Sequence, residues 1–178
     1  KTGDLPHKVA RIWAESILRI SGINVKIRGL KNIDTSKSYI YMANHQSNFD
    51  IPVLSAYLPV QFRWLAKAEL FKIPLFGLAM RRVGYIPIDR SDFRAAITSL
   101  KKAAETIRKG TSVIIFPEGT RSMDGQIREF KKGGFIMAID SQIPIVPVVI
   151  YGTRAIMPKT TLRIQPNNVL IEIKKPIP

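Results

Sequence analysis

Short apolar segments that favour β-strands alternate along this chain with longer segments of helical periodicity, and this alternation is the main constraint on its fold. The predicted strands are residues 23–28, 39–43, 61–66, 84–88, 112–116, 145–151 and 169–174. The predicted helices are residues 6–20, 49–57, 92–109 and 133–140, and a helical turn begins at Lys67. The alternation predicts a single α/β domain, in which helices flank a mixed, mostly parallel sheet.

The charge of the chain narrows the range of partners. Its 28 basic and 13 acidic residues give a net charge of +15, which attracts nucleic acid, anionic membranes or phosphorylated substrates, although solubility alone is a simpler explanation. We do not expect nucleic-acid binding, because the basic residues are scattered and no recognition motif is present. The chain has no cysteine, which excludes disulfides, thiolate zinc sites and a thiol nucleophile.

Residues 1–22 are predicted as an amphipathic N-terminal helix, and residues 23–178 as the main domain. Apolar residues recur at helical spacing at Val9, Ile12, Trp13, Ile17 and either Leu18 or Ile20. Two interpretations fit: a surface helix packed on the core, or a helix lying on an anionic membrane with its tryptophan near the headgroups. No apolar run reaches the roughly 18 residues that span a bilayer. The chain begins with lysine rather than methionine, which leaves room for a membrane anchor upstream.

A histidine and an aspartate follow the second predicted strand, in Asn44-His-Gln-Ser-Asn-Phe-Asp50. Asp50 is expected in the first turn of the next helix, with Ser47 as its N-cap. A carboxylate bonded to one ring nitrogen of His45 would leave the other nitrogen free to accept a proton, as a general base requires. By itself this spacing is often only structural. His7, the other histidine, is predicted to lie on the surface.

A second polar cluster follows the fifth predicted strand, in Phe116-Pro-Glu-Gly-Thr-Arg-Ser122. The planar guanidinium of Arg121 suits a phosphate or a carboxylate, and long ordered loops of this kind often carry function. A charged surface turn is the alternative. Asp89 and Arg90 follow another strand, where they form either a salt bridge or a second phosphate contact.

Four segments of the chain together resemble the four sequence blocks of the glycerolipid acyltransferases in order and spacing. They are residues 44–50, 84–90, 116–122 and 145–149. The resemblance extends from about residue 23 to residue 150 and is strongest to the 1-acylglycerol-3-phosphate acyltransferases. It implies transfer of an acyl group from a thioester to lysophosphatidate, which forms phosphatidic acid in phospholipid biosynthesis. A sibling activity, with glycerol 3-phosphate or another lysophospholipid as the acceptor, is the alternative.

The resemblance also implies roles for individual residues. His45 and Asp50 correspond to the catalytic pair, in which Asp50 orients His45 as the general base. Residues corresponding to substrate-binding positions are Lys67, Arg90, Glu118, Gly119, Thr120 and Arg121. The oxyanion of the tetrahedral intermediate is expected to bind backbone N–H groups near Gly119 or at the start of the helix at residues 49–57.

The expected partners follow from the same chemistry. The acceptor hydroxyl attacks the thioester directly, so no enzyme nucleophile is needed. We expect no metal, because arginines neutralise the phosphate and the base is a histidine. We also expect no cofactor, with acyl-CoA or an acyl carrier protein thioester as co-substrate. Both substrates carry apolar tails, and the protein is therefore expected at a membrane lipid surface, on the cytoplasmic face. The apolar segment at residues 73–80 has three interpretations: it lines the acyl site, it dips into the membrane, or it is plain core.

Overall fold

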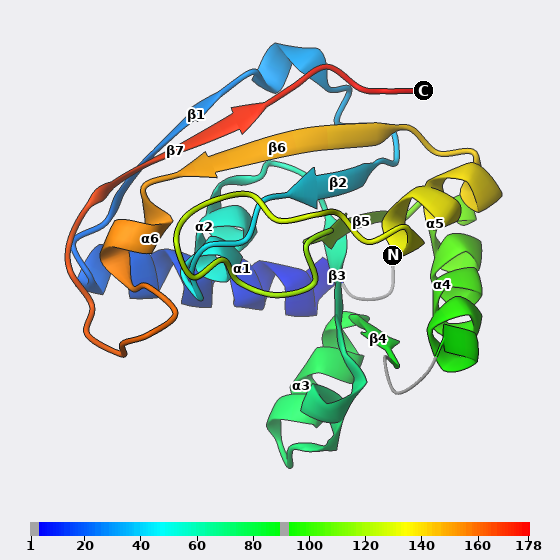
Figure 1. Cartoon of the computed structure of the whole chain (residues 1–178), viewed down its shortest axis with the longest axis horizontal. Helices are drawn as coiled ribbons and strands as arrows, with labels where there is room; N and C mark the ends of the chain where they lie inside the picture. The colour runs from blue at the N-terminus through cyan, green and yellow to red at the C-terminus, as the bar shows by residue number, and fades with distance from the viewer. Residues whose placement is uncertain (1–3, 90–92) are drawn as a thin grey trace.

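Seven strands form one sheet in the order β1-β7-β6-β2-β5-β3-β4, in a computed structural model that describes residues 4–89 and 93–178 (Figure 1). The strands are β1 (Asn24–Arg28), β2 (Ile40–Ala43), β3 (Phe62–Lys67), β4 (Ile86–Ile88), β5 (Ser112–Ile115), β6 (Ile145–Tyr151) and β7 (Asn168–Ile173). Neighbours among β6, β2, β5, β3 and β4 pair in parallel, β7 is antiparallel to β6, and β1 is parallel to β7. The predicted mixed and mostly parallel sheet is confirmed.

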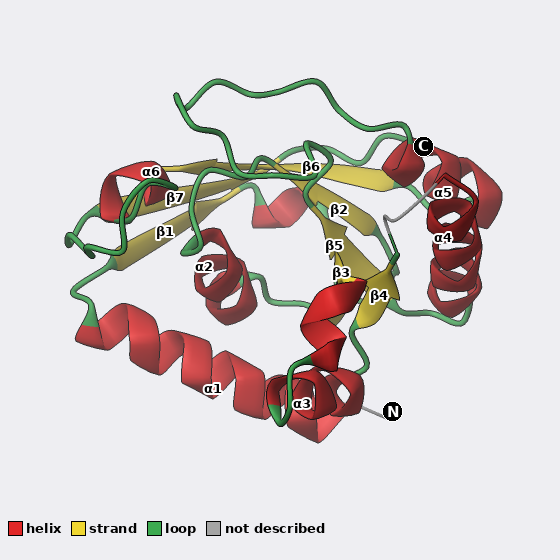
Figure 2. Ribbon diagram, turned by 60° about the horizontal axis from the view of Figure 1, so that its bottom comes forward, coloured by secondary structure: helices red, strands yellow, loops and turns green. Residues whose placement is uncertain are grey.

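Helices cover both faces of this sheet (Figure 2). They are α1 (Asp4–Ile20), α2 (Asp50–Tyr57), α3 (Phe76–Val83), α4 (Phe93–Arg108), α5 (Gly133–Ser141) and α6 (Thr153–Ile156), with 3₁₀ turns at Leu30–Asn32 and Ala68–Lys72. Side chains alternate between the faces of a strand. In β2, Tyr41 therefore packs with α1 and α2, whereas Ile40 and Met42 pack with α4 and α5. The sequence did not predict α6, which is only one turn long.

The carboxyl ends of five adjacent parallel strands meet at one edge of the sheet. The segments that leave this edge are residues 44–49 after β2, residues 116–132 after β5, the 3₁₀ turn after β3, Asp89 after β4, and α6 after β6. In open α/β sheets this edge is the usual place for a binding site. The topology therefore gathers at one edge the polar segments that are dispersed along the sequence.

Helix α1 has two apolar faces. Ala14 and Leu18 are buried against the core, so the helix does pack on the domain. Val9, Ile12 and Trp13 lie on another face, and 58%, 62% and 56% of their respective surfaces are exposed. From its periodicity alone, the sequence predicted one apolar face that contained residues of both. Among residues 4–89 and 93–178, no helix has the length and the hydropathy that would let it cross a bilayer.

Two other interpretations of the sequence do not hold in the structure. His7 is buried rather than on the surface, and its ring meets the edge of the Phe62 ring with 5.0 Å between centroids. It lies seven residues before Ala14, which places both on the inward face of α1. The segment at residues 73–80 is not plain core either, because Leu75 is 82% exposed and Phe76 is 51% exposed.

Candidate active site

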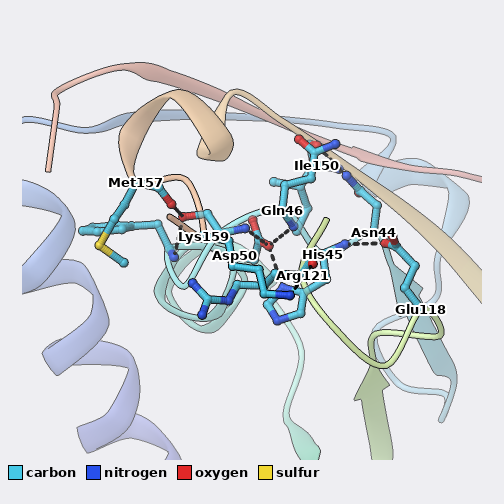
Figure 3. Close-up of polar contacts among 11 residues, drawn as sticks. Asn44, His45, Gln46, Asp50, Glu118, Arg121, Ile150, Met157 and Lys159 are labelled. Atoms are coloured by element: carbon cyan, nitrogen blue, oxygen red, sulfur yellow. Dashed lines mark hydrogen bonds and ion pairs between the residues drawn. The ribbon is translucent and has the colours of Figure 1, made fainter. Parts of the chain in front are cut away.

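His45 and Asp50 form the predicted pair. The Nδ1 atom of His45 lies 2.8 Å from Oδ2 of Asp50 (Figure 3). The same oxygen accepts hydrogen bonds from the backbone N–H groups of Gln46, at 2.7 Å, and Ser47, at 2.9 Å. The Asp50 side chain is fully buried, whereas 14% of the His45 side chain is exposed. Because Oδ2 acts only as an acceptor here, Nδ1 carries the proton and Nε2 is left as a proton acceptor.

Ser47 does not cap α2 as the sequence predicted. The helix begins at Asp50, and its N-cap position is Phe49, which makes no side-chain capping bond. The Ser47 hydroxyl instead accepts a hydrogen bond from the Phe49 N–H, at 3.1 Å, and donates to the carbonyl of Met157, at 2.8 Å. Ser47 is thus a buried link between the His45 segment and the segment that follows α6.

The aromatic ring of Phe116 is a feature of the site that sequence analysis missed. It stacks on the imidazole of His45 with 3.8 Å between centroids and 7° between planes. Trp64 from β3 in turn stacks on Phe116, with 5.3 Å between centroids. The stack fixes the plane of the imidazole, and the Asp50 bond fixes its rotation within that plane. The one signal available in the sequence was that Phe116 begins the second polar cluster.

Glu118 holds the backbone of His45. Its Oε1 accepts the His45 N–H at 2.7 Å, and its Oε2 accepts the Arg128 N–H at 3.0 Å. Only 3% of Glu118 is exposed. The His45 carbonyl in turn accepts the Ser122 N–H at 2.8 Å. Both carboxylate oxygens of Glu118 therefore act on backbone groups, so its observed contacts are those of a positioning residue.

A third link closes this corner of the molecule. The Asn44 side chain donates to the Ile150 carbonyl at 3.0 Å and accepts the Ile150 N–H at 2.7 Å. The Asn44 amide bonds to the backbone of β6 as a neighbouring strand would, and so extends the pairing of β2 with β6 beyond the end of β2. The residue before His45 is thereby tied to β6, and His45 itself to the loop after β5.

Four of the expected oxyanion donors already have partners. Gly119 has a φ of +73°, a left-handed conformation that favours glycine, and its N–H donates to the Phe116 carbonyl at 3.0 Å. At the start of α2, the N–H groups of Gln46 and Ser47 donate to Asp50, and that of Phe49 donates to Ser47. These groups position the loops, and any of them would have to change partner to bind an oxyanion.

The remaining predicted residues occupy different surroundings. Thr120 and Arg121 lie on the loop beside His45, where the Lys159 ammonium donates to Thr120 Oγ1 at 3.1 Å and to the Arg121 carbonyl at 3.2 Å (Figure 3). Lys67 ends β3 on the same edge of the sheet, and its ammonium pairs with Glu69 at 3.3 Å. A bond from its own backbone N–H and the Lys67 contact lower the pKa of Glu69. Arg90 lies outside the described residues.

Comparisons with known proteins agree on one family. The family model described as Acyltransferase matches residues 24–151. The chain is 40% identical over 173 residues to the chloroplastic 1-acyl-sn-glycerol-3-phosphate acyltransferase LPAT1 of Arabidopsis thaliana, which covers 96% of this chain and 48% of the plant protein. It is 33% identical to the human 1-acyl-sn-glycerol-3-phosphate acyltransferase alpha, with coverage of 96% and 61%. The chain thus spans about half to three fifths of these relatives.

The fold is also found among solved structures. The 1-acyl-sn-glycerophosphate (LPA) acyltransferase PlsC from Thermotoga maritima superposes with a TM-score of 0.82 at 30% identity, and the match covers 96% of this chain and 68% of that protein. The similarity therefore extends over the sheet, the helices on both faces and the edge that carries His45.

Proposed function

This chain belongs to the acyltransferase family, and we propose that it transfers an acyl group from a thioester to the free hydroxyl of lysophosphatidate, forming phosphatidic acid. The observation that carries this proposal is the His45–Asp50 pair, which leaves Nε2 as a proton acceptor beside a loop that bears Arg121. The names of the relatives supply the acceptor, and acylation of its free hydroxyl gives phosphatidic acid.

The geometry suits direct attack by the acceptor hydroxyl. His45 Nε2 removes the hydroxyl proton as the oxygen bonds to the thioester carbonyl carbon, a contribution of roughly 10² to 10⁴ in rate. Asp50 holds the ring through Nδ1 and stabilises the imidazolium. When the tetrahedral intermediate collapses, the carbon–sulfur bond breaks and the thiolate takes the proton from Nε2. No enzyme nucleophile takes part, and no cofactor or metal is required by this sequence of steps.

The acceptor phosphate is bound by cations at the same edge. Arg121 offers a planar fork that suits a phosphomonoester, and Lys67 adds charge from the end of β3. Arg90 is the third proposed phosphate ligand. Gly119 lets the loop turn, and Thr120 provides a hydroxyl beside Arg121. Glu118 supports this group by holding the loop against His45. The thioester donor is acyl-CoA or an acyl carrier protein.

The surface formed by α1 and α3 is proposed to lie on a membrane. The two helices contact each other (Figure 2). The first exposes Val9, Ile12 and Trp13, and the second exposes Phe76, with the exposed Leu75 at its N-cap. An apolar helix face with a basic surround is typical of a helix at a lipid interface. Because Trp64 is buried, a blue shift of tryptophan emission on addition of anionic vesicles would report mainly on Trp13. Unchanged emission would contradict this placement.

The decisive experiment is transfer of a labelled acyl group to lysophosphatidate in detergent or liposomes, with wild type beside His45→Ala. We expect phosphatidic acid from the wild type and a loss of at least about 10²-fold in the variant. Circular dichroism checks that the variant is folded. Near-normal turnover by a folded His45→Ala protein would refute the mechanism.

The same assay decides between substrates. Acyl-CoA and acyl carrier protein are supplied separately as donors, and glycerol 3-phosphate and a lysophosphatidylcholine replace lysophosphatidate as acceptors. A wild-type protein that acylates one of these acceptors but not lysophosphatidate would refute the proposed substrate and retain the reaction class.

A further inference from the structure

Lys159 reaches the proposed phosphate site from a part of the chain outside the four family-like segments. It lies between α6 and β7, half-buried, and its ammonium donates to Thr120 Oγ1 and to the Arg121 carbonyl (Figure 3). The chain separation is 39 residues from Thr120. A free lysine side chain samples many rotamers. The two hydrogen bonds made by Lys159 therefore hold its charge in one position.

The backbone near Lys159 is anchored to the catalytic segment. The carbonyl of Met157, two residues earlier, accepts a hydrogen bond from the buried hydroxyl of Ser47. The backbone N–H of Ser47 in turn donates to Asp50. On the other side, the Gln165 N–H donates to the Ile156 carbonyl at 2.9 Å and closes the loop. Lys159 is therefore carried by a loop that is fastened at its base, next to the His45–Asp50 pair.

The positive charges around this turn have no counter-ion among the residues that the structure describes. Within the part of the chain that the structure describes, neither the Lys159 ammonium nor the Arg121 guanidinium has a carboxylate partner, whereas Lys67, Arg128 and Lys174 each have one. A third cation is close by, because a Cβ atom on Gly119 would lie 2.9 Å from Cε and 3.1 Å from Nζ of Lys131. Positive charges gathered around one loop repel one another, and a bound dianion would relieve that repulsion.

We propose that Lys159 is a phosphate-binding residue that, together with Arg121, holds the phosphomonoester of the acceptor. Two of the three N–H groups of its ammonium act on Thr120 and Arg121, which leaves one directed donor for a phosphate oxygen. Arg121 contributes the planar fork and Lys159 the point charge. This inference rests on the proposed function, since it assigns a residue to the acceptor of that reaction.

Steady-state kinetics of Lys159→Met and Lys159→Arg test the proposal, with lysophosphatidate and the thioester donor varied in turn. A charge-assisted hydrogen bond predicts a rise of roughly 10- to 100-fold in the KM for lysophosphatidate in Lys159→Met, with the donor KM unchanged. Lys159→Arg should restore most of the loss. Inorganic phosphate should compete with lysophosphatidate less strongly against Lys159→Met than against the wild type.

Lys37→Met is the matched control, because it removes one positive charge from an exposed lysine that is paired with Asp34 before β2, at the opposite edge of the sheet. It should leave both KM values unchanged. An unchanged acceptor KM in Lys159→Met would overturn the proposal. So would a rise that Lys159→Arg does not restore, or a Lys159→Met protein that does not fold, because either result identifies a structural clamp. A wild type that does not acylate lysophosphatidate would instead refute the proposed function itself.

Discussion

Two regions of this molecule use polar and apolar side chains in opposite ways. In the corner where the His45 segment meets the loop after β5, buried polar groups bond to one another: Asp50 Oδ2 accepts three hydrogen bonds, and each oxygen of Glu118 accepts one. On the surface of α1 and α3, large apolar side chains such as Trp13 and Phe76 are exposed to solvent.

The difference concerns how each region depends on single residues. A buried polar network depends on every partner, because a donor or acceptor left unpaired costs about 1–3 kcal/mol. An apolar surface acts through its area, so that each residue contributes a share of roughly 25 cal/mol per Å² when it is covered. Substitutions in the corner should therefore alter the chemical step strongly, whereas those on the α1 surface should weaken membrane binding gradually.

The largest effect in this comparison is expected from Asp50→Asn. An asparagine oxygen in the position of Oδ2 retains all three hydrogen bonds of that atom, so the substitution removes mainly the negative charge that stabilises the imidazolium. We expect kcat to fall by roughly 10²-fold or more, without reaching the loss of about 10⁴-fold that follows when the tautomer is also wrong. Single-turnover kinetics measures this loss.

The matched control for this prediction is Asp140→Asn, which changes an exposed carboxylate near the end of α5. It should leave kcat unchanged. A kcat of Asp50→Asn similar to that of this control would show that catalysis does not depend on the charge of Asp50. The proposed contrast between the two regions would then be refuted.

A smaller effect is expected from Glu118→Gln. The amide retains one acceptor oxygen, so one of the two buried backbone N–H groups, of His45 or Arg128, then faces an NH₂ group. We expect a loss of about 1–3 kcal/mol in the free energy of unfolding. A small displacement of His45 should lower kcat by up to roughly 10²-fold, with the KM for lysophosphatidate unchanged. Urea unfolding and steady-state kinetics measure the two quantities.

Glu129→Gln is the control, since it makes the same exchange at an exposed position on the same loop. The kinetics also distinguish the two roles considered for Glu118. A raised acceptor KM at unchanged kcat would place the Glu118 carboxylate on the substrate, as the family resemblance implied, rather than on the backbone of His45.

Local spacing explains which parts of the site could be predicted from the sequence. His45 and Asp50 lie five residues apart, between the end of a strand and the start of a helix, and this short unit brings them together almost regardless of the rest of the fold. The strands were predictable for a similar reason, because most are short apolar runs with polar flanks and β1 alternates polar and apolar residues. The alternation of strands and helices then indicated the mostly parallel sheet.

The other contacts depend on which strands are neighbours, and no local pattern encodes that order. Glu118 binds the His45 backbone across 73 residues, which requires β2 and β5 to be adjacent. The stacking of Phe116 on His45 requires the same adjacency. Lys159 reaches Thr120 only because β6 lies on the other side of β2. On α1, periodicity detects apolar residues but does not say which of two apolar faces is covered.

The smallest effect on chemistry, and the clearest contrast with the corner, is expected from the double variant Ile12→Gln/Trp13→Gln on α1. Both side chains are more than half exposed, so the free energy of unfolding should change by only about 0.5 kcal/mol per site. Activity on lysophosphatidate dispersed in detergent should match the wild type. Binding to anionic vesicles should weaken by about 10-fold, because less apolar area enters the lipid interface.

Co-sedimentation with vesicles measures this binding, and Leu162→Gln is its control. Leu162 is 86% exposed and lies in the segment between α6 and β7, so its substitution removes an exposed apolar side chain that belongs to neither α1 nor α3. Equal losses from the two variants would mean that any exposed apolar residue contributes alike, and that α1 is not a lipid-binding face. A loss confined to the α1 variant, with turnover in detergent retained, would show that membrane contact and acyl transfer depend on separate regions of this chain.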